Sequence, residues 1–211
     1  VPAMILILLF SSFMAFAVSR FSFKFNVSLL LLFSAGNLLP AQVLFQPLFQ
    51  MFKHIPWPNW ASDTDTGYLL GTKIAVIIVH VAFQTGFCTF VLSNYMKTIP
   101  RELNEAALVD GYTRAQAFLR VVLPEARTGM AVTAVFCLIS AWNEYGFAMT
   151  LNSSGAITVP AYFAGLAGNI EGMPWPQVAA GALVFVAPIV VFTVLVRKHL
   201  LRGMTFGTIK Q

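Results

Sequence analysis

The sequence contains little charge and a large amount of apolar surface. Only 10% of its 211 residues are charged, whereas a soluble domain carries about 25%. Hydrophobic residues make up 58% of the chain, 20 residues are Phe, and the mean hydropathy is +0.77. A soluble protein of this size could not bury so much apolar surface, so the composition predicts a membrane protein.

Cysteine is also scarce, and the motifs of several function classes are missing from the sequence. Cys88 and Cys137 lie in apolar runs, with neither metal-ligand spacing nor a disulfide framework around them. Because there is no glycine-rich phosphate loop ending in Lys and Ser or Thr, we expect no ATP to bind. The formal charge of +5 does not indicate nucleic-acid binding, since the basic residues are spread over loop ends. No catalytic Ser/His/Asp or Cys/His set can be assembled, so we expect neither an enzyme nor a bound metal or cofactor.

Five apolar segments are long enough to cross a bilayer. They cover residues 1–18, 29–52, 68–94, 127–150 and 176–196, each near the ~20 residues that a spanning helix needs. In lipid such continuous segments must be helices, and the first lacks the basic region and cleavage site of a signal peptide. We predict an all-α, polytopic membrane protein that forms one domain over residues 1–211, and we expect one further spanning helix upstream.

The distribution of basic residues predicts the orientation. The link at 19–28, the polar stretch at 97–126 with the residue that follows it, and the tail at 197–211 hold 11 of the 13 Lys and Arg. The opposite side holds only Lys53 and Lys73. The positive-inside rule therefore places the polar stretch and the tail in the cytoplasm.

The polar stretch has the pattern of two short helices joined at a glycine. Pro100 suits a helix start, Glu102 and Glu105 suit its first turns, and Gly111 suits its end. A second amphipathic run, TRAQAFLRVVL, begins at Thr113, and we expect Pro124 to end it. Physics alone leaves two alternatives of equal weight: a surface that docks into a partner, with alanines allowing close approach, or a linker helix that lies on lipid.

A spaced motif in this stretch resembles a known family. The motif consists of Glu105-Ala106-Ala107, then three residues, Gly111, nine further residues, and Val121-x-Leu123-Pro124. This pattern resembles the EAA loop of binding-protein-dependent ABC importers. Val121 stands where Ile is commonest. The resemblance implies that the stretch is a coupling helix seated in a separate cytoplasmic ATPase. The docking residues would be Glu105, Ala106, Ala107, Asp110, Gly111, Leu123 and Pro124.

The resemblance continues along the chain toward carbohydrate-type, maltose-permease-like members. It is carried by AFAVSRFSFKF at 15–25, LLPAQVLFQPLF at 38–49, AWNEYGFAMTL at 141–151 and RGMTFGTIKQ at 202–211. Tyr112 and TGM at 128–130 depart from the usual Ala and proline. The family implies a type I importer fold, and a tail that reaches the ATPases. Its external loop, beginning at Asn152, Ser153 and Ser154, would meet an extracytoplasmic solute-binding protein.

Polar side chains within the spans are candidates for a solute pathway. Gln42, Gln46 and Gln50 recur at four-residue spacing on one helix face, and amides suit a hydroxylated solute. The alternative is that they join neighbouring helices. His80 and Gln84 form a similar pair, although a lone histidine is more often a packing residue. The last candidates are Trp142, Asn143 and Glu144, because an intramembrane carboxylate is costly unless it has a function.

The sequence thus predicts the permease subunit of a bacterial ABC importer in the inner membrane, working by ATP-driven alternating access. Its expected partners are a second homologous permease, a solute-binding protein, and an ATPase dimer that holds ATP and Mg²⁺. The alternatives are a self-contained secondary transporter and a membrane-embedded enzyme that uses His80 and Glu144. An external formal charge of −2 favours neutral sugars or polyols as the solute; it is the sum over Lys53, Lys73, Asp63, Asp65, Glu144 and Glu171.

Overall fold

The computed structural model describes residues 2–21, 28, 31–32, 40–61, 66–152, 158–166 and 172–205. Within these residues the fold is all-α, as predicted, and the single β-bridge joins Pro56 to Tyr68. The long helices are α1 (Pro2–Arg20), α3 (Ala41–His54), α4 (Lys73–Met96), α8 (Arg127–Trp142) and α11 (Trp175–Thr205). The short elements are η1 (Asn59–Ala61), α5 (Arg101–Val109), α6 (Arg114–Ala117), the π-helix η2 (Phe118–Val122), α7 (Leu123–Glu125), α9 (Gly146–Leu151) and α10 (Val159–Leu166).

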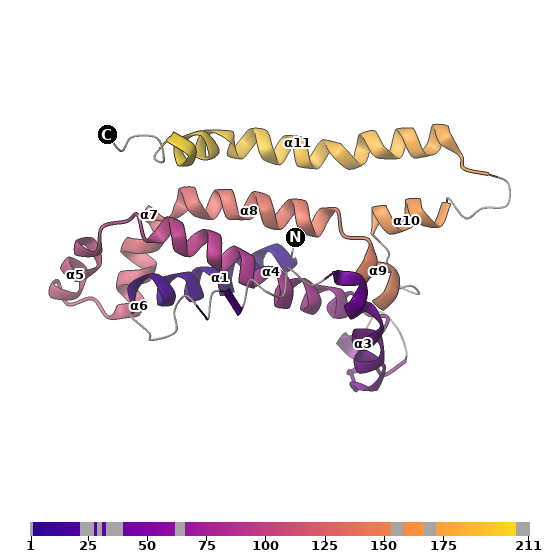
Figure 1. The fold of residues 1–211 in the computed structure, drawn as a ribbon, viewed down its shortest axis with the longest axis horizontal. Coiled ribbons are helices and arrows are strands. Elements are labelled where there is room, and N and C mark those ends of the chain that lie inside the picture. Colours follow the sequence, from indigo (N-terminus) through magenta and orange to yellow (C-terminus); the bar gives the residue numbers. More distant parts are fainter. Residues whose placement is uncertain are drawn as a thin grey trace.

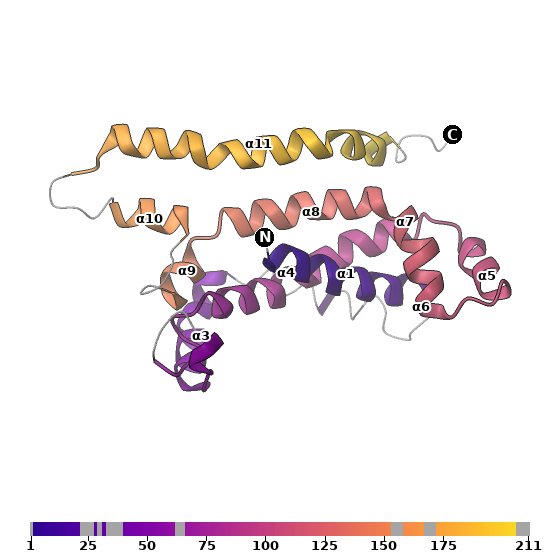
Figure 2. The ribbon, with the colours of Figure 1, turned by 180° about the vertical axis from the view of Figure 1, so that it is seen from behind.

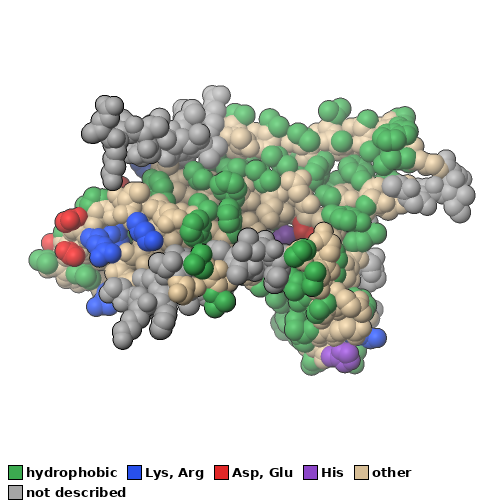
Figure 3. Space-filling view, viewed as in Figure 1, with side chains coloured by type: hydrophobic (Ala, Val, Ile, Leu, Met, Phe, Trp, Pro, Cys, Tyr) green, Lys and Arg blue, Asp and Glu red, His purple; other side chains and the backbone are tan. Residues whose placement is uncertain are grey.

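Helices α1, α4, α8 and α11 run along the longest axis of the molecule (Figure 1). Helix α1 packs against α4, α8 packs against both, and α11 lies along the outer side of α8. The short helices α5, α6 and α7 form one end of the bundle, and α3 and α9 form the other, as the reverse view also shows (Figure 2). Charged side chains are prominent around α5 and α6, while apolar side chains dominate the long helices (Figure 3).

Among the described residues, three helices are long and apolar enough to cross a membrane: Pro2–Arg20, Lys73–Met96 and Trp175–Val196. They correspond to the first, third and fifth predicted spans. The bent pair Arg114–Glu125 and Arg127–Trp142 makes a fourth if it is counted as one span. The helix of the third predicted span, α4, begins at Lys73 and not at residue 68, because the Thr72 side chain caps it by accepting a hydrogen bond from the Ala75 N–H. Helix α11 continues to Thr205, so residues 197–205 of the expected tail are helical.

The other two predicted spans differ from expectation. The span predicted at 127–150 is broken, since α8 ends at Trp142 and α9 starts at Gly146. Helix α8 has 16 residues, and it meets the helical segment Arg114–Glu125 at a bend of 77°. The span predicted at 29–52 lies partly outside the described residues. Residues 31–32 are helical, and residues 41–52 belong to α3, which has 14 residues.

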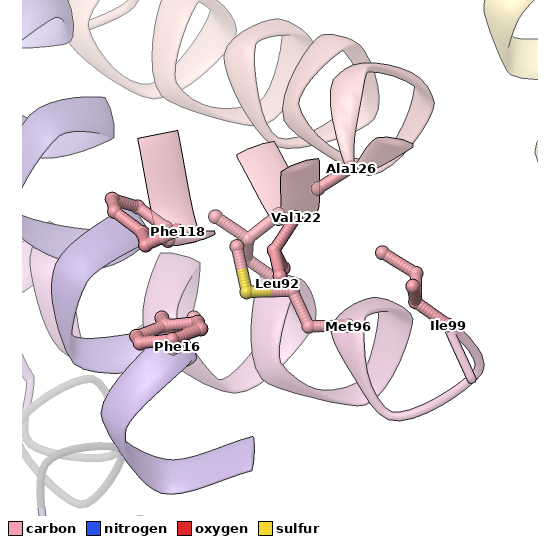
Figure 4. Packing of buried hydrophobic residues seen from close by; sticks show 8 residues of the cluster. Phe16, Leu92, Met96, Ile99, Phe118, Val122 and Ala126 are labelled. Atoms are coloured by element: carbon pink, nitrogen blue, oxygen red, sulfur yellow. The ribbon is translucent and has the colours of Figure 1, made fainter. Parts of the chain in front are cut away.

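An apolar cluster attaches the polar stretch to the bundle. It joins side chains of α1 and α4 to side chains of the segment from η2 to α8 (Figure 4), namely Ala15, Phe16, Leu92, Met96, Ile99, Phe118, Val122 and Ala126. Phe118 contributes most of the aromatic contact, with ring centroids 4.7 Å from Phe16 and 5.1 Å from Phe13. We call this group the coupling cluster.

A second apolar cluster closes the opposite end of the bundle, and we call it the outer cluster. It contains Phe52, Leu69, Ala75, Val79 and Leu151. The N–H of Gly71 donates to the carbonyl of Leu151 across 2.7 Å, which ties the start of α4 to the end of α9. This end therefore holds α3, α4 and α9 in fixed relation.

The coupling cluster makes a prediction about stability. Phe118 is 2% exposed, whereas its neighbour Leu119 is 51% exposed. Phe118→Ala should lower the free energy of unfolding by about 3 kcal/mol, because it leaves a cavity between the polar stretch and the bundle. Leu119→Ala is the control and should change it by less than ~0.5 kcal/mol. Thermal unfolding of the detergent-purified protein measures both, and equal shifts would contradict the assigned core.

Candidate coupling surface and solute cavity

The polar stretch lies between the end of α4 at Met96 and the start of α8 at Arg127. Its first helix, α5, follows Pro100 and stops at Gly111, which has a φ of +86°. The Tyr112 N–H donates to the Ala107 carbonyl, and the Gly111 N–H donates to the Leu108 carbonyl. This pair of bonds is the Schellman ending, which requires a left-handed residue and favours glycine. The predicted role of Gly111 as a helix stop is therefore confirmed.

The second half of the stretch starts with a capping box. Gln116 accepts the Thr113 N–H at 2.8 Å through its side chain, and the Thr113 hydroxyl accepts the Gln116 N–H at 3.3 Å. The segment then passes through η2 and α7, and ends at Ala126. The prediction that Pro124 ends the segment is wrong, because Pro124 lies in the first turn of α7, where a missing N–H costs little.

The side chains predicted to dock differ in their exposure. Glu105, Ala106, Asp110, Gly111 and Pro124 are exposed. Ala107 is only 4% exposed, and Leu123 packs partly against the coupling cluster. The expectation that Ala107 presents its side chain to a partner is therefore wrong. Val109, which the sequence analysis did not select, is 88% exposed on the same short helix.

Contacts from α1 also hold the polar stretch in place. The Arg20 guanidinium donates to the carbonyl of Ile99 at 3.1 Å, just before α5 begins. The Arg114 guanidinium lies 5.2 Å from the ring centroid of Phe21. The stretch is thus joined to the end of α1 by polar contacts and to the coupling cluster by apolar ones.

A cavity of about 440 Å³ lies between α3, α4, the end of α8 and the start of α9. It brings together five of the eight predicted pathway residues: Gln42, His80, Gln84, Asn143 and Glu144. None of the described residues that line it is Lys or Arg. The cavity therefore offers amide groups to a ligand and no fixed positive charge.

Two of the amides in the cavity wall are oriented by hydrogen bonds. The Ser140 hydroxyl donates to Gln84 Oε1 at 3.2 Å, and Asn143 Nδ2 donates to the Ile139 carbonyl at 2.9 Å. Each amide keeps further donor or acceptor capacity, because a primary amide has two N–H groups and a carbonyl. Ser140 was missed by the sequence analysis, although it lies only three residues before Asn143.

Glu144 has a structural role in the cavity wall. Its carboxylate accepts the N–H of Phe147 at 2.6 Å with one oxygen and the N–H of Ala148 at 2.9 Å with the other. These are first-turn N–H groups of α9, which have no partner within the helix. The side chain is 8% exposed. Glu144 thus caps α9, which explains an acidic residue at this depth without contact to solute.

The other candidate residues that the structure describes lie away from the cavity. Trp142 Nε1 donates to the Phe185 carbonyl at 3.0 Å, so this side chain faces α11. Gln46 and Gln50 are exposed and do not line the cavity, which meets only the first turns of α3. Asn152 is buried at the end of α9, and Ser153 and Ser154 lie outside the described residues.

Aromatic residues that the sequence analysis did not select also line the cavity: Phe45, Phe83, Tyr145 and Phe147. The spacing of residues in the sequence could have identified one of them, Phe83. Phe83 follows His80 by three residues and precedes Gln84, so all three share one face of a helix.

The chain matches known membrane components of transport systems. Residues 7–205 match the family described as binding-protein-dependent transport system inner membrane component. The chain is 28% identical over 206 residues to the sulfoquinovosyl glycerol transport system permease protein SmoH of Agrobacterium fabrum, covering 97% of this chain and 68% of that one. It is 30% identical to the trehalose transport system permease protein SugB of Mycobacterium tuberculosis, covering 93% and 68%. It is 29% identical to the trehalose/maltose transport system permease protein MalG of Thermococcus litoralis, covering 95% and 68%.

A solved structure has the same fold. It is the crystal structure of a bacterial ABC transporter involved in the import of the acidic polysaccharide alginate, with a TM-score of 0.62, 18% identity, and coverage of 93% of this chain and 72% of that one. Since the family match extends over most of the sequence, the chain belongs to the inner membrane components of binding-protein-dependent transport systems, as a permease subunit and not an enzyme.

Proposed function

We propose that the chain moves a neutral sugar or polyol-like solute across the inner membrane by ATP-driven alternating access. It acts as one transmembrane unit beside a second homologous permease. An extracytoplasmic binding protein delivers the solute, and a cytoplasmic ATPase dimer holds ATP and Mg²⁺, so that this chain binds no cofactor.

The observation that carries the proposal is the set of amides that line the cavity, together with the absence of Lys and Arg from its described lining residues. Gln42, Gln84 and Asn143 come from three separate elements and meet there. Hydroxyl groups can both donate to and accept from such amides. An anionic solute would find no Lys or Arg among the described lining residues, and a buried unpaired charge is costly. The names of SugB and MalG, which mention trehalose and trehalose/maltose, support the same class.

Helix α4 provides a route from the ATPase side to the cavity. Leu92 and Met96 belong to the coupling cluster, and His80 and Gln84 line the cavity on the same unbroken helix. The helix has 24 residues, which makes it about 36 Å long at the α-helical rise. A movement of α5 and α6 would therefore reach the cavity through one rigid element.

The energetics of the cycle follow from linkage. A ligand shifts a conformational equilibrium only if it binds one state more tightly than the other. We infer that ATP and the solute-loaded binding protein both favour the outward-open state. The external loop that starts at Asn152 would contact the binding protein, and the tail beyond α11 would contact the ATPases.

The proposal is tested by reconstituting the chain in lipid vesicles with its partner permease, ATPase and binding protein. Radiolabelled trehalose, maltose and glucitol are the probes, and both uptake and ATP hydrolysis are measured. We expect ATP-dependent uptake of a neutral solute only when the binding protein is present. Uptake without ATP or without the binding protein would contradict the proposed mechanism.

The coupling surface predicts a specific effect at Gly111. An added Cβ at this position meets no atom of the chain within 4 Å, so the strain that a substitution adds within the chain arises from the positive φ. Gly111→Val should lose most uptake and most stimulation of ATP hydrolysis, because a β-branched residue disfavours this conformation by more than ~1 kcal/mol. Gly111→Asn is the matched control and should retain coupling, because Asn tolerates positive φ. Equal coupling in the two variants would show that the conformation of this turn is not required.

The cavity predicts that substitutions at two neighbouring residues affect different properties, namely solute uptake and stability. Asn143→Leu should reduce uptake and leave the unfolding temperature unchanged, because it removes an amide from the cavity wall. Glu144→Leu should lower the unfolding temperature, because two N–H groups of α9 lose their acceptor, at a cost of about 1–3 kcal/mol each. Uptake and thermal unfolding are measured on both purified variants. If Asn143→Leu transported normally, Asn143 would not belong to the pathway.

A further inference from the structure

The solute cavity has an aromatic side that the amide groups do not explain. Phe45, Phe83 and Phe147 come from α3, α4 and α9, and all three line the cavity. The rings of Phe83 and Phe147 are nearly parallel, at 15° with their centroids 6.0 Å apart. Phe45 meets Phe147 edge-on, at 79° and 5.1 Å. The three rings form one apolar surface, which we call the aromatic wall.

The aromatic wall is supported from behind. Phe83 and Phe147 pack against the outer cluster, so each ring is fixed by buried neighbours and only partly faces the cavity. The ring of Phe45 lies over Gly146, at a point where an added Cβ would overlap with the ring. The wall is therefore pre-organised, which lowers the entropic cost of binding a ligand against it.

The rest of the cavity surface complements the aromatic wall. Gln42, Gln84 and Asn143 line the same cavity, with the Gln84 amide held by Ser140. A ligand with an apolar face and a set of hydroxyl groups would complement both surfaces. The volume of about 440 Å³ lies within the range of roughly 300–1,000 Å³ that small-molecule pockets occupy.

We propose that the aromatic wall binds the C–H face of a neutral pyranose ring while the amides bind its hydroxyl groups. This inference rests on the proposed function, and it narrows the solute from sugars and polyols to cyclic sugars. A pyranose chair presents several C–H groups on one side, and these carry slight positive charge that an aromatic face attracts. An acyclic polyol has no such fixed face, so it would gain only the amide contacts.

Saturation-transfer NMR on the assembled complex in nanodiscs tests the proposal without the binding protein. The probes are methyl β-D-glucopyranoside and the acyclic polyol glucitol. For the parent complex we expect saturation of the ring C–H protons of the glucoside, and a much weaker effect on glucitol. The double variant Phe83→Leu with Phe147→Leu should bind the glucoside about tenfold more weakly, because it keeps apolar volume but loses the aromatic faces.

Two further variants separate contact with the ligand from packing. Phe83→Tyr keeps an aromatic face and should retain the signal. Phe136→Leu removes a half-exposed ring of α8 that contacts Phe87 and does not line the cavity, so it should behave as the parent. Unfolding temperatures of all variants are recorded. A loss of signal in Phe136→Leu equal to that of the double variant would overturn the inference.

Uptake by the parent complex in vesicles distinguishes the two levels of the proposal. If the parent takes up no sugar at all, the proposed function fails, and the inference fails with it. If the parent takes up sugar, three results each overturn the aromatic wall alone. These are no glucoside signal in the parent, equal signals for glucoside and glucitol, or an undiminished signal in the double variant.

Discussion

Backbone N–H and C=O groups have no water to bind inside a bilayer, so every break in a spanning helix needs a substitute partner. The carboxylate of Glu144 is such a substitute. It accepts two N–H groups at the start of α9 and so stabilises a break directly after α8. The break turns the chain, and Asn143, Tyr145 and Phe147 line the cavity as a result. An unbroken helix would place Tyr145 on the face opposite to Asn143 and Phe147, which are four residues apart. The cavity therefore depends on a cap that does not itself need to touch solute.

The same constraint is met differently at the two ends of the molecule. At the polar stretch the ends of α5 and α6 are closed by the turn at Gly111 and by the capping box of Thr113 and Gln116. These devices use short polar side chains and a glycine, which suits an end where the side chains are largely exposed. At the cavity end an acidic side chain is used, and it is buried where it accepts the N–H groups of α9. Helix α4 connects the two ends without interruption.

The sequence predicted the features that depend on local pattern. The spans at α1, α4 and α11 follow from apolar length, and the helix stop at Gly111 follows from the placement of glycine after a run of helix formers. The break after Trp142 was not predicted, because apolar residues continue on both sides and the capping bond becomes visible only when the chain turns. Four-residue spacing placed Gln46 and Gln50 on one face with Gln42, but spacing does not reveal how far along a helix a cavity extends. The orientation of Trp142 depends on where α11 packs, which is a long-range contact.

The interface between α1 and α4 is built differently from the interface between α4 and α8. The two helices of the first pair pack against each other, and both bury small hydroxyl residues: Ser12 and Ser19 on α1, and Thr85 and Ser93 on α4. Their hydroxyls donate to carbonyls of their own helices, so the polar groups are satisfied without bonds between helices. Between α4 and α8, by contrast, Gln84 bonds to Ser140. In lipid, helices associate through close packing and interhelical hydrogen bonds. A shift of α1 along α4 would therefore break none of these hydroxyl bonds, whereas α4 and α8 are held together at the cavity, where a defined geometry matters for a solute.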